Sequence, residues 1–130
     1  KIFGIGTDIV NIERIDLSLK KYGSIFKKRN FSKREILYCD KKKNPSAFYA
    51  KRFAAKEAFS KALGTGIRKG IDLKNIEISN NALGKPSILL KGKIANYLEK
   101  KIKSRKYYIH LSLSDDKPWA QATVIISYNK

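Results

Sequence analysis

Apolar positions follow a helical spacing in much of the first half of this chain. Residues 12–22 place an apolar side chain every three or four positions, which predicts an amphipathic helix. Asn11 is a suitable N-cap for this helix and Gly23 a suitable end. Before it, the apolar run 2–5 predicts a first strand, which residues 8–10 either continue or leave by a turn.

A second helix is expected after the first. Ser32 and Glu35 have the spacing of a capping box, so the helix should begin there and carry Ile36 and Leu37 on its apolar face. The lysine-rich stretch 41–44 that follows is interpreted as a loop before the next helix.

The clearest helix of the sequence runs from Pro45 to Gly64. Asn44 can cap it, Pro45 suits its first position, and Gly64 can stop it. Two apolar stripes follow its length, one of mixed size and one of alanines: Phe48, Ala55, Phe59 and Ala62, and Ala47, Ala50, Ala54 and Ala58. Because small side chains let another backbone approach closely, this helix is expected to be central and largely buried.

After Gly70 the apolar positions alternate, as they do in strands. The pattern predicts a strand around 76–78, a turn at 80–86, a strand at 87–90, a helix at 92–105, and strands at 107–113 and 120–128 joined by a loop at 114–118. Helices followed by paired strands indicate one compact α+β domain over residues 1–130, with a largely antiparallel sheet packed on the long central helix.

Charge and cysteine content narrow the function classes. The chain has 29 Lys and Arg against 11 Asp and Glu, a net charge of +18, which attracts polyanions. A compositional drift toward solvated lysines in every segment would give the same net charge.

The one cysteine, Cys39, excludes an internal disulfide, favours a reducing cytoplasm, and is interpreted as a tolerated thiol. No apolar run of about 18 residues and no signal pattern are present, so neither a membrane span nor secretion is expected.

Two carboxylates are candidates for chemistry. Asp8 follows Gly6 and Thr7 at the end of an apolar run, and Glu57 lies on a helix otherwise rich in Ala and Phe. Two hard carboxylates from separate elements are the usual way to hold Mg²⁺. The alternatives are that Asp8 caps a turn and that Glu57 forms an ordinary helical ion pair with Lys61, four residues on.

Three further segments are candidates for phosphate binding. The stretch Gly64-Thr65-Gly66 ends the long helix, where flexible backbone allows a ligand to approach. Gly84-Lys85-Pro86 forms a turn with one positive charge. His110, the only histidine, shares a strand face with Ser112 and Ser114 and either lines an anion site or is a hydrogen-bonded core residue.

In order along the chain, these segments resemble the holo-[acyl carrier protein] synthase type of phosphopantetheinyl transferase. The similarity is carried by Gly6 to Val10, Phe53 to Gly66, Gly84 to Pro86 and His110 to Asp115. Four motifs in order and at similar spacing form a specific signal, whereas 67–78 and the lysine-rich loop match loosely.

The resemblance implies an activity and a set of roles. The enzyme would transfer phosphopantetheine from coenzyme A to a serine of apo acyl carrier protein, in support of fatty acid biosynthesis. Asp8 and Glu57 would ligate Mg²⁺, and Lys61 would lie near the coenzyme A phosphates. Glu57, ionised beside the metal, would receive the serine proton, directly or through a metal-bound water. The expected coenzyme A contacts are Lys61, Gly64, Thr65, Gly66, Lys85, Pro86 and His110. Arg14, on the first helix, would meet the acidic carrier protein.

The same resemblance implies a homotrimer with active sites between neighbouring subunits, located in the cytoplasm. The main competing hypothesis is a nucleic-acid-binding module, which the charge of +18 and the seven tyrosines fit superficially. Against it, the most distinctive segments carry Asp8, Glu57, Asp115 and Asp116, which repel phosphates without a metal. We therefore expect no nucleic acid and no membrane among the partners.

Overall fold

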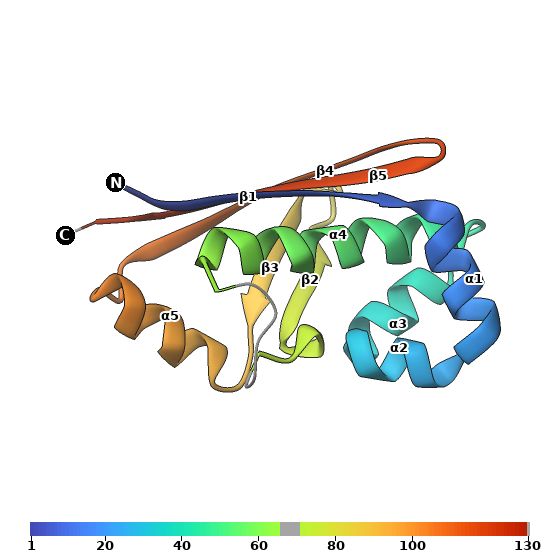
Figure 1. The fold of residues 1–130 in the computed structure, drawn as a ribbon, viewed down its shortest axis with the longest axis horizontal. Helices are drawn as coiled ribbons and strands as arrows, with labels where there is room; N and C mark the ends of the chain where they lie inside the picture. The colour runs from blue at the N-terminus through green and yellow to red at the C-terminus, as the bar shows by residue number, and fades with distance from the viewer. Residues whose placement is uncertain (66–70, 130) are drawn as a thin grey trace.

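In the computed structural model, which describes residues 1–65 and 71–129, the long helix α4 (Pro45–Leu63) lies along one face of a three-stranded sheet (Figure 1). The sheet is antiparallel, and its strands lie in the order β1 (Ile2–Asn11), β5 (Trp119–Tyr128), β4 (Tyr107–Asp116). A second sheet is the hairpin of β2 (Ile76–Asn80) and β3 (Pro86–Leu90), which packs against α4 and borders β4. The α+β class, the antiparallel pairing and the buried central helix are as the sequence predicts.

Strand β1 (Ile2–Asn11) packs backbone to backbone against α4. It continues through residues 8–10, so the alternative of a turn at this point is wrong. A Cβ atom on Gly4 or Gly6 would lie 1.9 Å from the carbonyl oxygen of Ala62 or Ala58, respectively. Glycine on the strand and alanine on the helix therefore allow the close approach that the stripe of small residues predicts, and they bring the side chains of β1 to the edge of α4.

Three short helices follow at one end of the sheet: α1 (Ile12–Tyr22), α2 (Ser24–Asn30) and α3 (Lys33–Asp40) (Figure 1). The Asn11 side chain accepts a hydrogen bond from the Glu13 backbone N–H at 2.9 Å, and the capping box of α3 is formed as predicted. Helix α2 was not predicted, because no side-chain cap marks its start.

The apolar face expected for α3 needs a correction. Ile36 is half-buried against the core, but Leu37 is 63% exposed. The residues that α3 buries are Glu35 and Cys39. Burial of a carboxylate in place of a leucine is possible because Glu35 meets a lysine from α4. At the N-terminus of α4, Asn44 occupies the cap position without the side-chain hydrogen bond that we expected, whereas Pro45 and Gly64 act as predicted.

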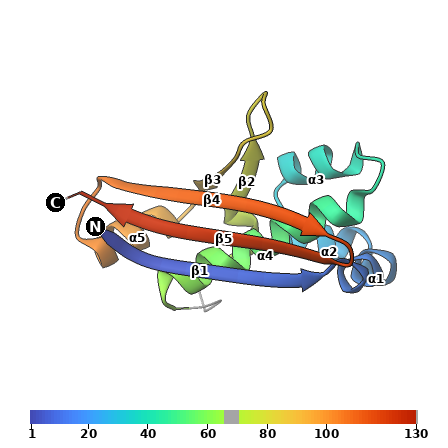
Figure 2. The ribbon, with the colours of Figure 1, turned by 90° about the horizontal axis from the view of Figure 1, so that it is seen from above.

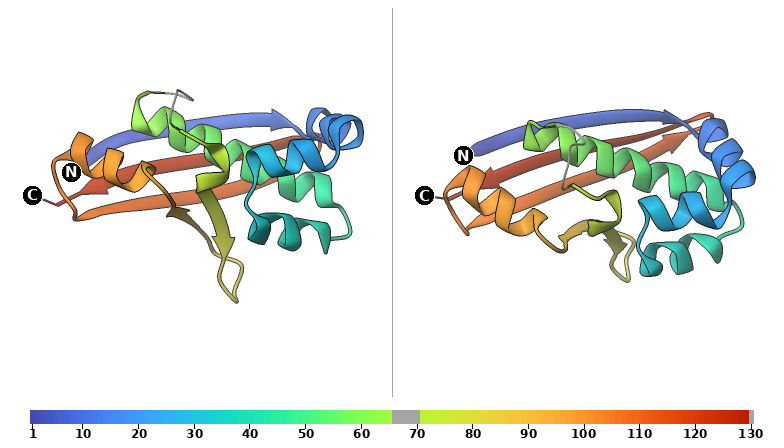
Figure 3. Two further views of the ribbon diagram at one scale, coloured as in Figure 1. Left: turned by 90° about the horizontal axis from the view of Figure 1, so that it is seen from below. Right: turned by 60° about the horizontal axis from the view of Figure 1, so that its bottom comes forward.

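The second half follows the predicted order with changed boundaries (Figure 3). A 3-10 turn, η1 (Leu73–Asn75), precedes the remaining elements: β2 (Ile76–Asn80), β3 (Pro86–Leu90), α5 (Ile94–Ile102), β4 (Tyr107–Asp116) and β5 (Trp119–Tyr128). Pairing of β4 with β5 reaches Asp116 opposite Trp119, so the connection is shorter than the predicted loop at 114–118. Helix α5 is also shorter than predicted.

The outer face of the three-stranded sheet is left uncovered by the helices (Figure 2). On β1 it carries Ile5 and Ile9, which are 60% and 61% exposed. Across the strands the Gln121 amide donates to the hydroxyls of Thr7 and Thr123 at 2.9 and 2.7 Å. This face thus combines exposed isoleucines with an ordered polar ladder. Within the described residues, no helix is long and apolar enough to cross a membrane.

Candidate active site

Asp8 and Lys61 meet where β1 crosses the C-terminal turns of α4. The Lys61 ammonium donates to Asp8 Oδ1 at 3.1 Å and to the Thr7 carbonyl oxygen at 2.9 Å. The Lys61 side chain is 55% exposed, whereas that of Asp8 is 18% exposed. An ammonium has three donors, and these contacts use two of them. Lys61 can therefore keep its contact with Asp8 and still donate to a ligand.

Glu57 lies one helical turn before Lys61 and is half-buried. Burial raises the pKa of its carboxyl group, the negative charge of Asp8 raises it further, and Lys61 opposes both effects. Among the described residues, Lys61 pairs with Asp8 and not with Glu57, so the alternative of an ordinary Glu57–Lys61 pair is not realised. Because the charge of Asp8 raises the pKa of Glu57, the two carboxylates are close enough to repel each other. A cation between them would relieve this repulsion.

A cleft of about 310 Å³ contains both carboxylates. Arg14 of α1 lies on its wall, together with Phe26 of α2 and Phe53 of α4. The two rings stack at 6.4 Å between centroids. The predicted residues Asp8, Arg14 and Glu57 thus share one cleft, with Lys61 joined to it through Asp8.

Asp8 and Glu57 are suited to a divalent cation that takes only one or two of its ligands from the protein. No group of three or more His, Cys, Asp or Glu side chains suited to a metal is found in the described residues. Mg²⁺ is commonly held by one or two carboxylates, with water and substrate phosphate completing its octahedron. Asp8 and Glu57 provide oxygens of this kind.

His110 belongs to a different surface. It is exposed on β4, and its Nε2 lies 3.0 Å from Ser127 Oγ, so the interpretation as a core histidine is wrong. Ser112 and Ser114 are exposed on the same face, as the alternation predicts. His110 also lines a groove of about 480 Å³ between β3 and β4. Within one chain this groove and the carboxylate cleft are separate.

Gly64, Thr65, Lys85 and Pro86 are not among the residues that line the cleft of the two carboxylates. Gly64 ends α4 with a left-handed φ of 89°. Thr65 is half-buried, and Gly66 lies outside the described residues. Lys85 is exposed in the β2–β3 turn, where its backbone N–H donates to Asn81 Oδ1, and Pro86 begins β3. Figure 2 shows this hairpin reaching away from β1 on the β4 side of the molecule.

Sequence reasoning missed the aromatic wall of the cleft. Phe26 lies on the unpredicted helix α2, and Phe53 was interpreted only as part of a motif. A signal for Phe26 was present, because the glycine that ends α1 is followed at once by apolar residues at positions 25 and 26. A glycine stop followed by a new apolar pair is compatible with a second helix at an angle to the first.

A family model described as the 4'-phosphopantetheinyl transferase superfamily matches residues 4–124. The chain belongs to this superfamily. Among curated relatives, the holo-[acyl-carrier-protein] synthase of Zymomonas mobilis is 53% identical over 128 residues, covering 96% of each chain. That of Dinoroseobacter shibae is 46% identical over 127 residues, covering 97% of this chain and 91% of the relative.

Solved structures of other superfamily members have the same fold. The holo-[acyl-carrier-protein] synthase of Neisseria meningitidis superposes with a TM-score of 0.89 at 40% identity, covering 98% of this chain and 99% of the other. The Helicobacter pylori synthase in complex with coenzyme A superposes with a TM-score of 0.82 at 36% identity, covering 95% and 99%. The resemblance drawn from the motifs and the α+β fold class is confirmed.

Proposed function

We propose that this chain is a holo-[acyl carrier protein] synthase. It transfers phosphopantetheine from coenzyme A to a serine hydroxyl of apo acyl carrier protein, and adenosine 3',5'-bisphosphate leaves. The observation that carries the proposal is the cleft with Asp8 and Glu57 beside Lys61, in a chain about half identical to synthases over nearly its whole length. The product would supply fatty acid biosynthesis.

Asp8 and Glu57 are proposed to hold Mg²⁺. Both side chains line one cleft, and the negative charge of Asp8 raises the pKa of Glu57, which supports a cation between them. When bound, the metal neutralises charge on the pyrophosphate oxygens. Because ligation requires the carboxylate form, both groups act as anions in the working enzyme.

The remaining steps are assigned to side chains of this chain. Lys61, held at 3.1 Å from Asp8, would donate its spare N–H to a pyrophosphate oxygen and stabilise the charge that grows on it. The carrier serine oxygen attacks the pantetheine-side phosphorus, and the bond from that phosphorus to the bridging oxygen breaks. Glu57, kept ionised beside a cation, is assigned to receive the serine proton, directly or through a water.

The nucleotide end of coenzyme A is proposed to bind between subunits of a homotrimer. Within one chain His110, Lys85 and Pro86 lie around β3 and β4, apart from the carboxylate cleft, so one chain offers two partial sites. The uncovered sheet face, with Ile5 and Ile9 exposed, supports packing against neighbouring copies. Gly64, Thr65 and Gly66 are proposed to border the same nucleotide.

Subunit mixing tests the shared site. If Glu57→Gln and His110→Ala chains are each inactive, co-expressed chains should regain activity, because some interfaces then combine two intact halves. Activity that stays at the level of the separate variants would contradict a shared site. Sedimentation of the wild-type chain should give the mass of three copies.

The carrier protein is proposed to meet Arg14 on the exposed side of the cleft. An acidic partner is favoured by the net charge of +18, which steers anions at low ionic strength. A cytoplasmic location, which the single buried thiol of Cys39 favours, stays a prediction.

The reaction is tested by the mass of apo acyl carrier protein after incubation with this protein, coenzyme A and Mg²⁺. We expect the mass of one phosphopantetheine to be added, and EDTA to abolish the gain. No gain with several folded carriers would overturn the transferase proposal. A gain that survives EDTA would overturn the metal requirement alone.

A further inference from the structure

A groove of about 540 Å³ is lined by residues of α2, α3 and η1 and shares no described lining residue with the carboxylate cleft. Phe31 forms part of its lining and is 2% exposed. Ile36 and Leu37 of α3 line it as well, and Leu37 is 63% exposed although it faces a hollow. Its volume falls in the range of small-molecule sites, about 300–1,000 Å³. We call it the α3 groove.

Unpaired lysines surround this apolar lining. Lys28, Lys33 and Lys74 all line the α3 groove and are exposed, and none of the three makes an ion pair within the described residues. Other cations in this region are paired: Lys27 with Asp40 at 3.1 Å, and both Arg34 and Lys91 with Glu77 at 3.5 and 2.8 Å. Lys91 also lines the groove and is paired with Glu77, and none of the described lining residues is acidic, so the three unpaired lysines give the lining a net positive charge.

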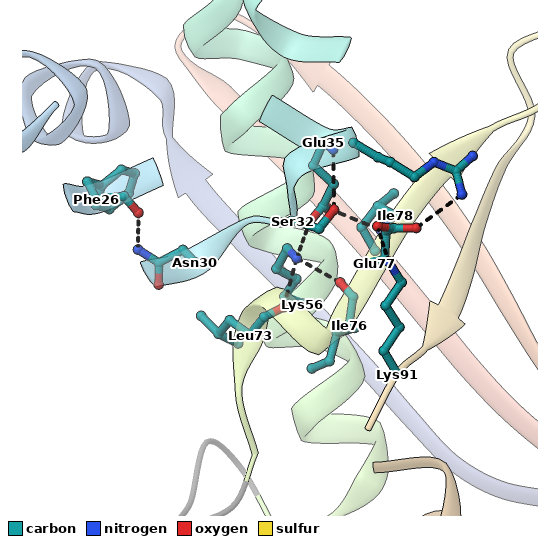
Figure 4. Close-up of polar contacts among 11 residues, drawn as sticks. Phe26, Asn30, Ser32, Glu35, Lys56, Leu73, Ile76, Glu77, Ile78 and Lys91 are labelled. Atoms are coloured by element: carbon teal, nitrogen blue, oxygen red, sulfur yellow. Dashed lines mark hydrogen bonds and ion pairs between the residues drawn. The ribbon is translucent and has the colours of Figure 1, made fainter. Parts of the chain in front are cut away.

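The walls of the α3 groove are held together by a buried polar network (Figure 4). Lys56 of α4 donates to Glu35 Oε1 of α3 at 2.7 Å and to the carbonyl oxygens of Leu73 and Ile76 at 2.8 and 2.7 Å. Glu35 also accepts from the backbone N–H groups of Ser32 and Ile78. Because α3, α4, η1 and β2 are joined in this way, the groove is formed before any ligand binds.

We infer that the α3 groove is a binding site for a single-chain fatty carboxylate. The apolar lining takes the alkyl chain, and Lys28, Lys33 and Lys74 surround the anionic head group. An inorganic anion would leave the lining formed by Phe31, Ile36 and Leu37 unused, and an acidic protein surface would not fill a concavity. The site is separate from the transfer reaction and uses none of its residues.

Titration calorimetry with octanoate, decanoate and dodecanoate below their micelle concentrations tests the inference. Saturating coenzyme A is present throughout, so that binding at the substrate site is excluded. Affinity should rise two- to fourfold for each added methylene, following the transfer free energy of a methylene group. Decan-1-ol, which lacks the charge, should bind at least about tenfold more weakly than decanoate.

Variants locate the binding. Leu37→Asp should weaken decanoate binding by at least about tenfold, and so should the double variant Lys33→Glu/Lys74→Glu. The matched controls are Leu17→Asp, which changes a leucine 64% exposed on α1, and Lys101→Glu on α5. Both controls should bind like the wild type. All five positions are exposed, and circular dichroism confirms that each of the four variants is folded.

Three results would overturn the inference: equal loss in Leu17→Asp and Leu37→Asp, no dependence on chain length, and decanol binding as tightly as decanoate. A fourth would reassign the groove. If Leu37→Asp and the lysine variant weaken binding of the acidic carrier protein while no carboxylate binds, the α3 groove is a protein contact instead.

Discussion

Two of the three lysines of helix α4, Lys56 and Lys61, lie five residues apart and meet carboxylates in opposite surroundings. Lys56 is fully buried, and its three N–H donors are used by Glu35 and two carbonyl oxygens. Lys61 is 55% exposed and has two partners on β1. A saturated ammonium can only hold the fold together, whereas one with a spare donor at the edge of a cleft can bind substrate.

The pKa of Lys56 is also consistent with a structural role for this residue. Burial lowers it, and the charge and hydrogen bond of Glu35 oppose that effect. A buried pair of this kind adds little stability compared with a well-packed apolar pair, but removing one partner leaves an unpaired buried charge. The comparison therefore predicts that the two lysines fail in different ways when they are replaced.

The largest expected effect is on stability. Lys56→Met should lower the free energy of unfolding by about 3–5 kcal/mol, because Glu35 would be left buried without its partner. Urea unfolding monitored by circular dichroism measures it, with Lys101→Met on the exposed side of α5 as the control. A loss below 1 kcal/mol in Lys56→Met would mean that Glu35 is compensated in another way.

The second prediction separates Lys61 from Lys56. Lys61→Met should lower kcat/KM about 100-fold, since the proposed donor to the transferring group is lost. Its stability should change by less than about 1 kcal/mol, as for an exposed ion pair. Steady-state kinetics and urea unfolding on the same preparation check both. A folded Lys61→Met enzyme with near wild-type kcat/KM would remove Lys61 from the mechanism.

The surroundings of Lys61 and of Lys56 also differ in how well they could be predicted from the sequence. Asp8 and Glu57 could be singled out from it, because a carboxylate on an Ala- and Phe-rich helix and an Asp at a strand end stand out locally. Their roles, and that of Lys61, came from the resemblance of the motifs to a known family. The Glu35–Lys56 pair could not, because its partners come from α3 and α4 and meet only through tertiary packing. Glu35 was predicted as a capping residue, and it has that role as well.

Local signals also explain which elements were predicted correctly. Asn11, the capping box and Gly64 marked helix ends that the structure has. Helix α2 was not predicted because no side-chain cap marks its start. Leu37 was predicted on the apolar face of α3, but Glu35 and its hydrogen-bond partners occupy the buried face, and Leu37 is exposed. The partner of Lys61 was also beyond local reasoning, because Asp8 is 53 residues away in sequence.

A smaller effect is expected at the rim of the cleft. Arg14→Glu should raise KM for the carrier protein about tenfold with little change in kcat, and should flatten the fall of kcat/KM with salt. Arg105→Glu, an exposed change outside the cleft, should leave KM within about twofold. Equal effects of the two variants would indicate that total charge, rather than position, attracts the carrier.

The smallest expected effect concerns Cys39, which neither region uses. Burial raises the pKa of its thiol to about 12, so the thiol stays protonated at neutral pH, and the side chain is 0% exposed. Because the thiolate is the reactive form, labelling by a disulfide reagent should be slow at pH 7 and become fast in concentrated guanidinium chloride. Fast labelling of the native protein would show that α3 opens readily.

The central claim, that the cleft of Asp8 and Glu57 carries out the transfer, is tested most directly by the turnover of Glu57→Gln at saturating Mg²⁺. The change removes the charge of the proposed metal ligand and proton acceptor while keeping the shape of the side chain, and Glu99→Gln on α5 is its matched control. We predict a loss of at least about 100-fold in kcat for Glu57→Gln, with the control unchanged. If folded Glu57→Gln keeps most of its turnover, Glu57 is neither a metal ligand nor a base, and the account of the cleft is wrong.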